Sequence, residues 1–336
     1  MKKASYLVIL ALIVLLVGCN QNEDSMKSAG DLESTARIDT EKQQLEIGPV
    51  SITTGLPLEE ENTENPKFSV MIENSPDARP HSGLVQADVV YEMEVEGNVT
   101  RFLALYNDDI PEKVGPARSS RHYYLPVAES WSMPYIHFGG SPQAYNKLST
   151  LNVPTIDGMT QSNYFIRDSS RYAPHNAYLV TNQLDAFEEE PINEKFAFDE
   201  DASYEEALNS TSLEITYNNF THVEYQYDEE ANQYKRFLEG QPHADRETGT
   251  QISANNIIVA YANQQLIPGD NSGRIDITLT GTGEAVYFLD GQAVKGTWKT
   301  EDGNLGFYLD DTLIALNPGK TWVQVVDASK KENVSY

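Results

Sequence analysis

Apolar and polar residues follow three different patterns along this chain of 336 residues. Residues 7–19 form an apolar run behind two lysines. Residues 20–66 hold few large apolar side chains, eleven carboxylates against three basic side chains, and no sustained periodicity. From Lys67 onward, short apolar or alternating segments separated by turn-forming residues predict strands and a few short helices. Folded structure should therefore begin near Lys67.

A hairpin is the clearest element of the first half. Residues 88–96 alternate so that every second side chain is apolar and the opposite face carries Glu92, Glu94 and Glu96. Gly97 and Asn98 predict a two-residue turn into a second strand at residues 100–106. Counting back from that turn places Glu94 opposite Arg101, which predicts an ion pair. Further strands are expected at residues 68–72, 134–138 and 163–167.

Helices are expected after three breaks in the pattern. Gly115 and Pro116 precede a helix-like pattern from Ala117, on which Arg118 and Arg121 would share one face because they are three residues apart. A short helix should begin at Pro142 and another at Thr181, reaching residue 189.

The second half changes character. From Leu213 onward, short alternating segments are separated by turn signals such as Asp290 with Gly291. The fold class is therefore predicted as α+β, with an N-terminal α+β domain of residues 67–210 and a mostly antiparallel, β-rich C-terminal domain of residues 211–328. Residues 199–212 are a possible linker, and the sequence leaves open whether the domains pack tightly or swing on it.

The apolar run at the start ends in the only cysteine, Cys19. The run is short for a membrane span and fits a signal peptide of residues 1–18, cut before the cysteine. A diacylglyceryl group and palmitate on Cys19 would anchor the chain to the cell membrane, because two acyl chains at ~0.8 kcal/mol per methylene make attachment effectively permanent. The protein is then expected at the extracytoplasmic face, with residues 19–66 as a disordered acidic stalk. No other thiol remains for a disulfide or for catalysis.

The net charge of −27 argues against nucleic-acid binding through a broad basic face, which depends on displacing counterions with Lys and Arg. Arginines nevertheless gather in one region, because six of the ten fall between residues 79 and 171. Guanidinium groups hold carboxylate or phosphate oxygens bidentately, so this clustering predicts an anion-binding pocket. Its proposed members are Arg118, Arg121, Arg167, Arg171, Ser119, Ser141, His175 and Asn176. The competing interpretation is that the nearby glutamates close every arginine internally.

Other chemistry has weaker support. Glu92, Glu94 and Glu96 are spaced ~6.6 Å apart on a strand, within the range of the carboxylate pairs that hydrolyse glycosides. His243 and Asp245 would share a face if extended, but two ligands do not make a metal site, so no metal is assigned. Ser119 and Ser141 lack the motifs of serine acyl enzymes. The sequence calls for no cofactor.

The motifs of the folded part support a family resemblance. Together with Cys19, the chain resembles the YerB-like lipoproteins of Gram-positive bacteria over residues 67–326. The motifs that carry this resemblance are MIENSPDARPHSGL, VGPARSSRHYY, PHNAY, GQPHADRETG and NPGKTW. The resemblance implies two consecutive domains and a layered arrangement of β sheets with helices on one side. It implies no established activity.

Three functions follow as hypotheses. The first is binding of an anionic wall component or a protein partner through an arginine-lined polar cleft. The second is a cofactor-free hydrolase acting on wall material through the three glutamates. The third is a structural adaptor for a membrane complex.

Overall fold

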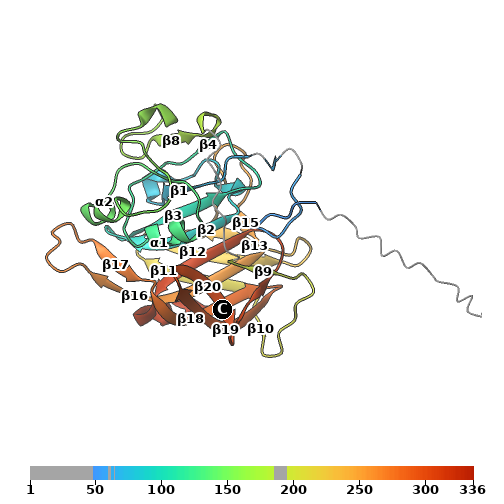
Figure 1. Ribbon diagram of the computed structural model, residues 1–336. Helices are drawn as coiled ribbons and strands as arrows, with labels where there is room; N and C mark the ends of the chain where they lie inside the picture. The colour runs from blue at the N-terminus through green and yellow to red at the C-terminus, as the bar shows by residue number, and fades with distance from the viewer. Residues whose placement is uncertain (1–47, 60–61, 64, 185–194) are drawn as a thin grey trace, which may run out of the picture. The chain divides into compact units, whose positions relative to one another are not determined.

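Strands dominate the fold, and they lie in several sheets (Figure 1). The computed structural model describes residues 48–59, 62–63, 65–184 and 195–336. By their contacts, residues 47–336 form one unit. Cys19 and the predicted signal peptide lie outside the described residues. Among the described residues, no helix combines the length and apolar character needed to cross a membrane.

The largest sheet draws strands from both predicted domains. Its first-half strands are β1 (Phe68–Glu73), β2 (Val89–Val95), β3 (Val99–Tyr106), β5 (Tyr135–His137) and β6 (Thr155–Asp157). Its second-half strands are β10 (Leu208–Asn209), β16 (Asn256–Leu266), β17 (Ile275–Thr278), β18 (Gly281–Leu289), β19 (Gln292–Glu301), β20 (Asn304–Leu309), β21 (Thr312–Leu313) and β23 (Thr321–Asp327). The two sets join where β23 pairs in parallel with β2 on one side and β16 on the other. The predicted domains therefore share a continuous sheet.

Three smaller sheets complete the strand set. The six-stranded sheet contains β11 (Ser212–Asn218), β12 (Thr221–Asp228), β13 (Gln233–Leu238), β14 (Gln241–Pro242), β15 (Ser253–Ala254) and β24 (Val334–Ser335). A three-stranded sheet contains β4 (Lys113–Val114), β8 (Ala177–Val180) and β7 (Phe165–Arg167), in that order. The strands β9 (Ala197–Phe198) and β22 (Ala315–Leu316) form a parallel pair.

Helices are few and short. The α-helices are α1 (Leu125–Ser130) and α2 (Pro142–Leu148), and the 3-10 helices are η2 (Pro76–Ala78), η3 (Leu84–Gln86), η4 (Ser162–Tyr164), η5 (Thr181–Gln183) and η6 (Ala328–Asn333). As expected, α2 begins at Pro142. Ser141 is its N-cap, and the Ser141 hydroxyl accepts a hydrogen bond from the Ala144 N–H at 3.1 Å. Of the helix expected from Thr181, only η5 lies in the described residues before residue 185. The α+β class with a β-rich second half is confirmed.

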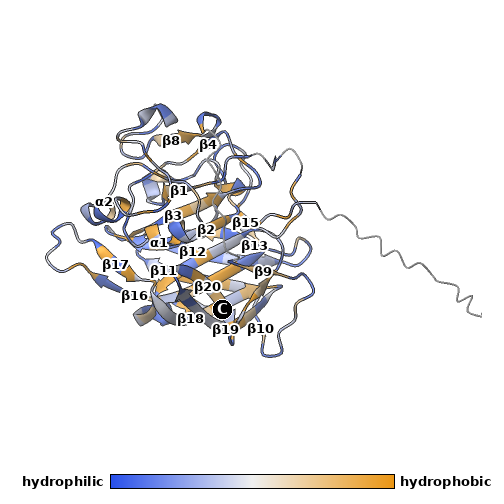
Figure 2. Ribbon diagram, in the orientation of Figure 1, coloured by the Kyte–Doolittle hydropathy of each residue, from blue (hydrophilic) through white to orange (hydrophobic). Residues whose placement is uncertain are grey.

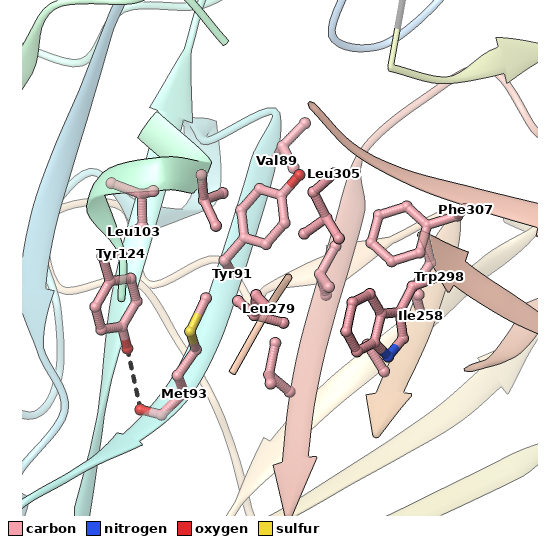
Figure 3. Close-up of a cluster of buried hydrophobic side chains, with 14 of the residues drawn as sticks. Val89, Tyr91, Met93, Leu103, Tyr124, Ile258, Leu279, Trp298, Leu305 and Phe307 are labelled. Carbon is pink, nitrogen blue, oxygen red and sulfur yellow. Dashed lines mark hydrogen bonds between the residues drawn. The ribbon is translucent and has the colours of Figure 1, made fainter. Parts of the chain in front are cut away.

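Both faces of β2 are covered, which explains why this strand is buried along its whole length. One face of β2 carries Tyr91 and Met93, which pack in a cluster with residues of α1 and of β16 to β20 (Figure 3). The opposite face carries Val90, which belongs to a second cluster with residues of the six-stranded sheet. Figure 2 shows apolar residues concentrated on these central strands and polar residues on the peripheral loops.

The hairpin register differs from the prediction by one residue. Val95 pairs with Val99, so three residues rather than two form the turn, with Gly97 and Asn98 at positive φ. Such a turn, ending in a left-handed residue, suits Asn98. Glu94 consequently lies opposite Thr100, and the predicted Glu94–Arg101 ion pair is wrong.

The helix predicted from Ala117 is also wrong. Residues 117–121 are not helical, and they are held by backbone hydrogen bonds to separate elements. The Arg118 N–H donates to the Met71 carbonyl at 2.9 Å, and the Phe138 N–H donates to the Arg118 carbonyl at 3.0 Å. Hydrogen bonds to β1 and to the residue after β5 thus outcompete local helix formation, and the helix begins only at Leu125.

The stretch assigned to the stalk is structured near its end. Ser51, Thr53 and Thr54 are buried, although their composition is polar. The Thr54 hydroxyl donates to Asp108 at 2.6 Å and the Thr53 hydroxyl donates to Asp88 at 3.1 Å. Hydrogen bonds to carboxylates, rather than an apolar core, hold this segment. Because such a segment has no apolar periodicity, the predicted start of folded structure at Lys67 is too late.

Candidate functional site

Five of the eight residues predicted to bind anions lie near one another on the surface. They form what we call the exposed arginine surface: Arg118, Arg167, Arg171, His175 and Asn176. Asn176 connects two of them, because its Oδ1 accepts from Arg167 Nη1 at 2.8 Å and its Nδ2 donates to the Arg171 carbonyl at 3.3 Å. Arg118 reaches the same loop and donates to the Pro174 carbonyl at 3.4 Å.

Neutral groups hold two of these arginines. The Arg167 guanidinium has the Asn176 amide as its hydrogen-bond acceptor, and it stacks over the Phe138 ring at 4.5 Å. Arg171 donates to the Asp77 and Pro80 carbonyls at 3.3 and 2.7 Å. Every other arginine in the described part of the chain lies within 4.0 Å of a carboxylate. Within the described ranges, no carboxylate lies within 4.0 Å of Arg167 or Arg171 to neutralise its charge.

Glu73 balances the third arginine. Its buried carboxylate lies 3.4 Å from Arg118 Nε and 3.0 Å from His175 Nδ1, and it accepts from the Ser75 hydroxyl at 3.0 Å. Ser75 Oγ also lies 3.3 Å from His175 Nδ1. The Ser75 hydroxyl and the Glu73 carboxylate thus meet the same ring nitrogen, whereas a catalytic triad needs them on opposite nitrogens. The exposed Asp77 carboxylate lies 3.9 Å from the other nitrogen, Nε2, which is beyond hydrogen-bonding distance. The cluster positions His175 and does not form a nucleophile.

The other three predicted residues lie elsewhere or serve the backbone. Arg121 is buried and forms a bidentate pair with Glu96, with Nε 2.8 Å from Oε2. The Ser119 hydroxyl donates to the Phe138 carbonyl at 3.1 Å, and Ser141 caps α2. Arg121 is therefore already occupied, as the competing interpretation expected, and the predicted eight-residue pocket is not formed.

Arg121 lowers the pKa of Glu96, although this carboxylate is partly exposed. Burial alone would raise the pKa of Glu96, but the hydrogen bonds and charge of Arg121, together with the charge of Arg101, lower it to about 2. The Arg101 guanidinium also lies against Glu96, at 3.9 Å, and donates to the Ser119 carbonyl at 2.5 Å. Glu96 is therefore the acid that Arg101 contacts, in place of the predicted Glu94.

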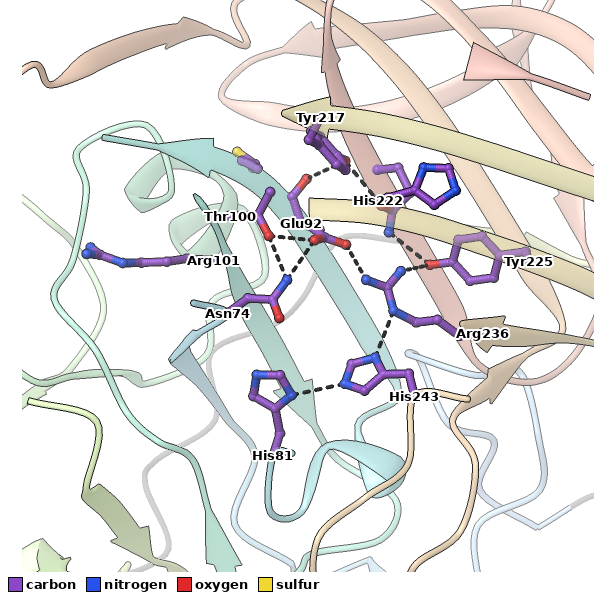
Figure 4. A network of polar contacts seen from close by, with 12 residues as sticks. Asn74, His81, Glu92, Thr100, Arg101, Tyr217, His222, Tyr225, Arg236 and His243 are labelled. Atoms are coloured by element: carbon purple, nitrogen blue, oxygen red, sulfur yellow. Dashed lines mark hydrogen bonds and ion pairs between the residues drawn. The ribbon is translucent and has the colours of Figure 1, made fainter. Parts of the chain in front are cut away.

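Glu92 is fully buried, although it lies on the polar face of its alternating strand. The six-stranded sheet covers that face of β2, and from β13 it supplies Arg236, whose Nη2 donates to Glu92 Oε2 at 2.8 Å with both side chains fully buried (Figure 4). Asn74 and Thr100 donate to the second oxygen at 3.1 and 2.6 Å. Removing two charges from water is costly unless every oxygen is paired, and here each one is.

A chain of histidines extends this buried network. Arg236 Nε donates to His243 Nδ1 at 3.0 Å, so His243 carries its proton on Nε2 and donates to His81 Nδ1 at 3.0 Å. His81 then donates from Nε2 to the Glu73 carbonyl at 2.7 Å. Each tautomer follows from the arginine, which is always a donor. Burial lowers the pKa of His81 to about 3 and that of His243 well below its usual value, so both rings are neutral.

Sequence reasoning missed this network, although one signal was present. In β13, Tyr234, Arg236 and Leu238 alternate on the buried face, so an arginine occupies an inward position. Such a residue requires a buried acid, but the sequence does not show that Glu92 is the acid, because 144 positions separate the two.

The remaining candidates have structural partners. Glu94 accepts from Asn218 Nδ2 at 3.2 Å and lies 3.5 Å from Lys330 Nζ. Asp245 accepts from the Leu84 and Glu247 N–H groups, both at 2.9 Å, and so caps two loops. Among the described residues, no group of three or more His, Cys, Asp or Glu side chains is arranged to hold a metal ion.

Known proteins match this chain over most of its length. Residues 53–193 match the family model described as "Protein of unknown function (DUF3048) N-terminal domain", and residues 213–323 match the corresponding C-terminal domain. A relative from Bacillus subtilis (strain 168), named "Putative lipoprotein YerB", is 33% identical over 282 residues, which are 81% of this chain and 85% of the relative.

A solved structure is similar as well. The crystal structure of the YerB protein from Bacillus subtilis matches with a TM-score of 0.75 and 31% identity, covering 85% of this chain and 99% of that one. The similarity therefore extends through both halves of the large sheet.

Proposed function

The chain belongs to the DUF3048 family, and since its relative from Bacillus subtilis is named "Putative lipoprotein YerB", we propose that this chain is itself a lipoprotein. A lipid on Cys19 holds it at the extracytoplasmic face of the cell membrane. The apolar run of residues 7–19 and its single cysteine support this location, as does the printed name of the relative.

The proposed activity is binding, through the exposed arginine surface, of an anionic group on a wall component or on a partner protein. The single observation that carries this proposal is that Arg167 and Arg171 find only neutral acceptors among the residues that the structure describes, in a chain with 51 acidic residues. Guanidinium groups left without a carboxylate favour a ligand that supplies one, or a phosphate.

The geometry gives the hydrolase hypothesis little support. Glu92 is enclosed by Arg236, Asn74 and Thr100, and a polysaccharide has no access to it. Glu96 is bound bidentately by Arg121. Neither acid is free for proton transfer at a glycosidic bond, which requires contact with the substrate oxygen. The structural adaptor remains the alternative, and it requires no role for the arginines.

A titration distinguishes these functions. The full-length protein in detergent is titrated with teichoic acid fragments and with muropeptides, as wild type and as Arg167→Ala. Arg274→Ala is the matched control, because Arg274 is paired with Asp270 at 2.8 Å. Binding should weaken in Arg167→Ala and persist in the control. Equal weak binding in all three proteins contradicts the proposal and favours the adaptor.

A further inference from the structure

The outer edge of β7 lies beside the exposed arginine surface and has no neighbouring strand in the described part of the chain. β7 pairs only with β8, with Ile166 opposite Tyr178 and Arg167 opposite Ala177. In Figure 1, β8 and β4 lie at the end of the molecule away from β18 and β19. An unpaired edge presents backbone donors and acceptors to any extended chain that approaches it.

Hydrogen bonds settle which backbone groups face outward. The Asp168 N–H donates to the Asn176 carbonyl at 2.9 Å, and the Phe165 N–H donates to the Ser162 carbonyl. In an antiparallel pair, the backbone N–H and C=O groups of successive residues point alternately toward and away from the partner strand. The backbone groups of Ile166 therefore face β8, and those of Arg167 face away from it. The N–H and C=O of Arg167 are thus directed at the open edge.

Hollows adjoin β7, and Ile166 lines both of them. One has a volume of about 410 Å³ and includes Pro111 and Val180. The other has a volume of about 280 Å³ and includes Phe138 and Met159. Ile166 and Met159 are 47% and 64% exposed, which is high for apolar side chains of this size. A strand added to this edge would direct alternate side chains to opposite faces, so that apolar residues could enter these hollows.

The charge beside the edge sets the second requirement. Arg167 and Arg171 have no carboxylate partner in the part of the chain that the structure describes, while the chain as a whole has a net charge of −27. An acidic ligand would be repelled from most of the surface and attracted here. Backbone groups at the edge and apolar hollows beside it are features that a peptide uses and a teichoic acid polymer does not.

We propose that an extended, acidic segment of a partner protein, with apolar residues between its acids, adds as a strand to the open edge of β7. This inference rests on the proposed function and specifies its ligand class. The acids contact Arg167 and Arg171, the backbone pairs with Arg167, and the apolar side chains cover Ile166 and Met159.

The test uses a short capped peptide that alternates glutamate and valine, titrated into the full-length protein in detergent. Two control peptides carry glutamine in place of glutamate, or N-methyl groups on every second residue to block strand pairing. We expect the first peptide to bind and to slow hydrogen exchange of the Arg167 N–H, and each control to bind roughly tenfold more weakly or not at all. An N-methylated peptide that binds equally well overturns the inference.

Ile166→Asn separates this inference from the function on which it rests, because Ile166 is exposed and is not an anion ligand, and the neutral replacement adds no charge beside Arg167. The variant should lose peptide binding, keep the wild-type melting temperature, and still bind teichoic acid fragments if these bind at all. A variant that keeps wild-type peptide affinity overturns the inference. In the wild type, binding of the fragments without binding of the peptide also overturns it and leaves the proposed function standing. If neither ligand binds the wild type, both fall.

Discussion

Arg236 and Arg167 are the same residue type in opposite settings. Arg236 is fully buried and meets Glu92, Tyr225 and His243, so its charge and its hydrogen-bonding capacity are satisfied inside the protein. Arg167 is exposed, and an amide and an aromatic ring are its contacts. The first connects β13 to β2 and belongs to folding. The second is expected to contribute little to folding, and the proposed function assigns it to a ligand.

Two further arginines, Arg121 and Arg118, are intermediate between these extremes in burial and in carboxylate contact. Arg121 is buried but its acid, Glu96, is partly exposed. Arg118 is partly exposed and shares Glu73 with His175. The more completely a carboxylate closes an arginine, the larger the expected effect of its removal on stability and the smaller its expected effect on binding.

The largest loss of stability is expected when Glu92 is replaced. Glu92→Gln leaves the Arg236 charge buried without a counter-charge, which should cost about 3–5 kcal/mol of unfolding free energy. Denaturant unfolding monitored by tryptophan fluorescence measures this. A double variant, Glu92→Leu with Arg236→Met, should recover most of the loss, because replacing both partners removes the uncompensated charge. A mild effect of Glu92→Gln alone would refute a closed buried pair.

Acid should destabilise the same region through its histidines. Because burial lowers the pKa of His81 to about 3, the unfolded state binds more protons than the folded state between that value and 6.5. The contribution of His81 to the unfolding free energy is then fully present above pH 6.5. It is lost as the pH falls through that window, and the loss is on the order of a few kcal/mol. Comparing unfolding free energies at pH 7 and pH 4 in wild type and His81→Gln isolates this contribution. An identical pH dependence in both proteins would exclude it.

Arg121→Ala should have an intermediate effect. Glu96 would lose its bidentate partner but keep solvent and Arg101 nearby, so the expected cost is about 1–3 kcal/mol. The pKa of Glu96 should rise from about 2 toward its ordinary value. Chemical denaturation and titration of the Glu96 carboxyl by NMR measure the two effects, and an unchanged carboxyl pKa would show that Arg121 does not lower it.

The smallest effect on stability is expected at the exposed arginine surface. Arg167→Ala should change the unfolding free energy by no more than about 0.5 kcal/mol, because it removes one amide hydrogen bond and one surface ring contact. A loss comparable with that of Arg121→Ala would show that Arg167 serves the fold and would remove the reason to assign it to a ligand.

Local patterns in the sequence predicted much of the fold. Alternation predicted β2, and the turn at Gly97 and Asn98 predicted β3 after it. Pro142 predicted the start of α2, and the change of pattern near Leu213 predicted the β-rich half. Two local predictions were wrong. Residues 117–121 gain more from hydrogen bonds to neighbouring elements than from a helical turn, and one extra residue in the turn shifted the hairpin register.

The candidate site was predictable only in part. The arginine-rich region indicated Arg118, Arg167 and Arg171, but the sequence could not show which carboxylates lie beside which guanidinium groups. Glu92 illustrates the limit, because its partner comes from a sheet formed more than a hundred residues later, and the polar side of an alternating strand is solvated only if nothing packs on it.

The most direct test of a ligand-binding role for these arginines is a titration of teichoic acid fragments and the acidic peptide into Arg167→Ala with Arg171→Ala, accompanied by an unfolding curve. The account predicts loss of binding for whichever ligand the wild type takes up, with unfolding free energy preserved to within about 0.5 kcal/mol. Wild-type affinity in this double variant would contradict it.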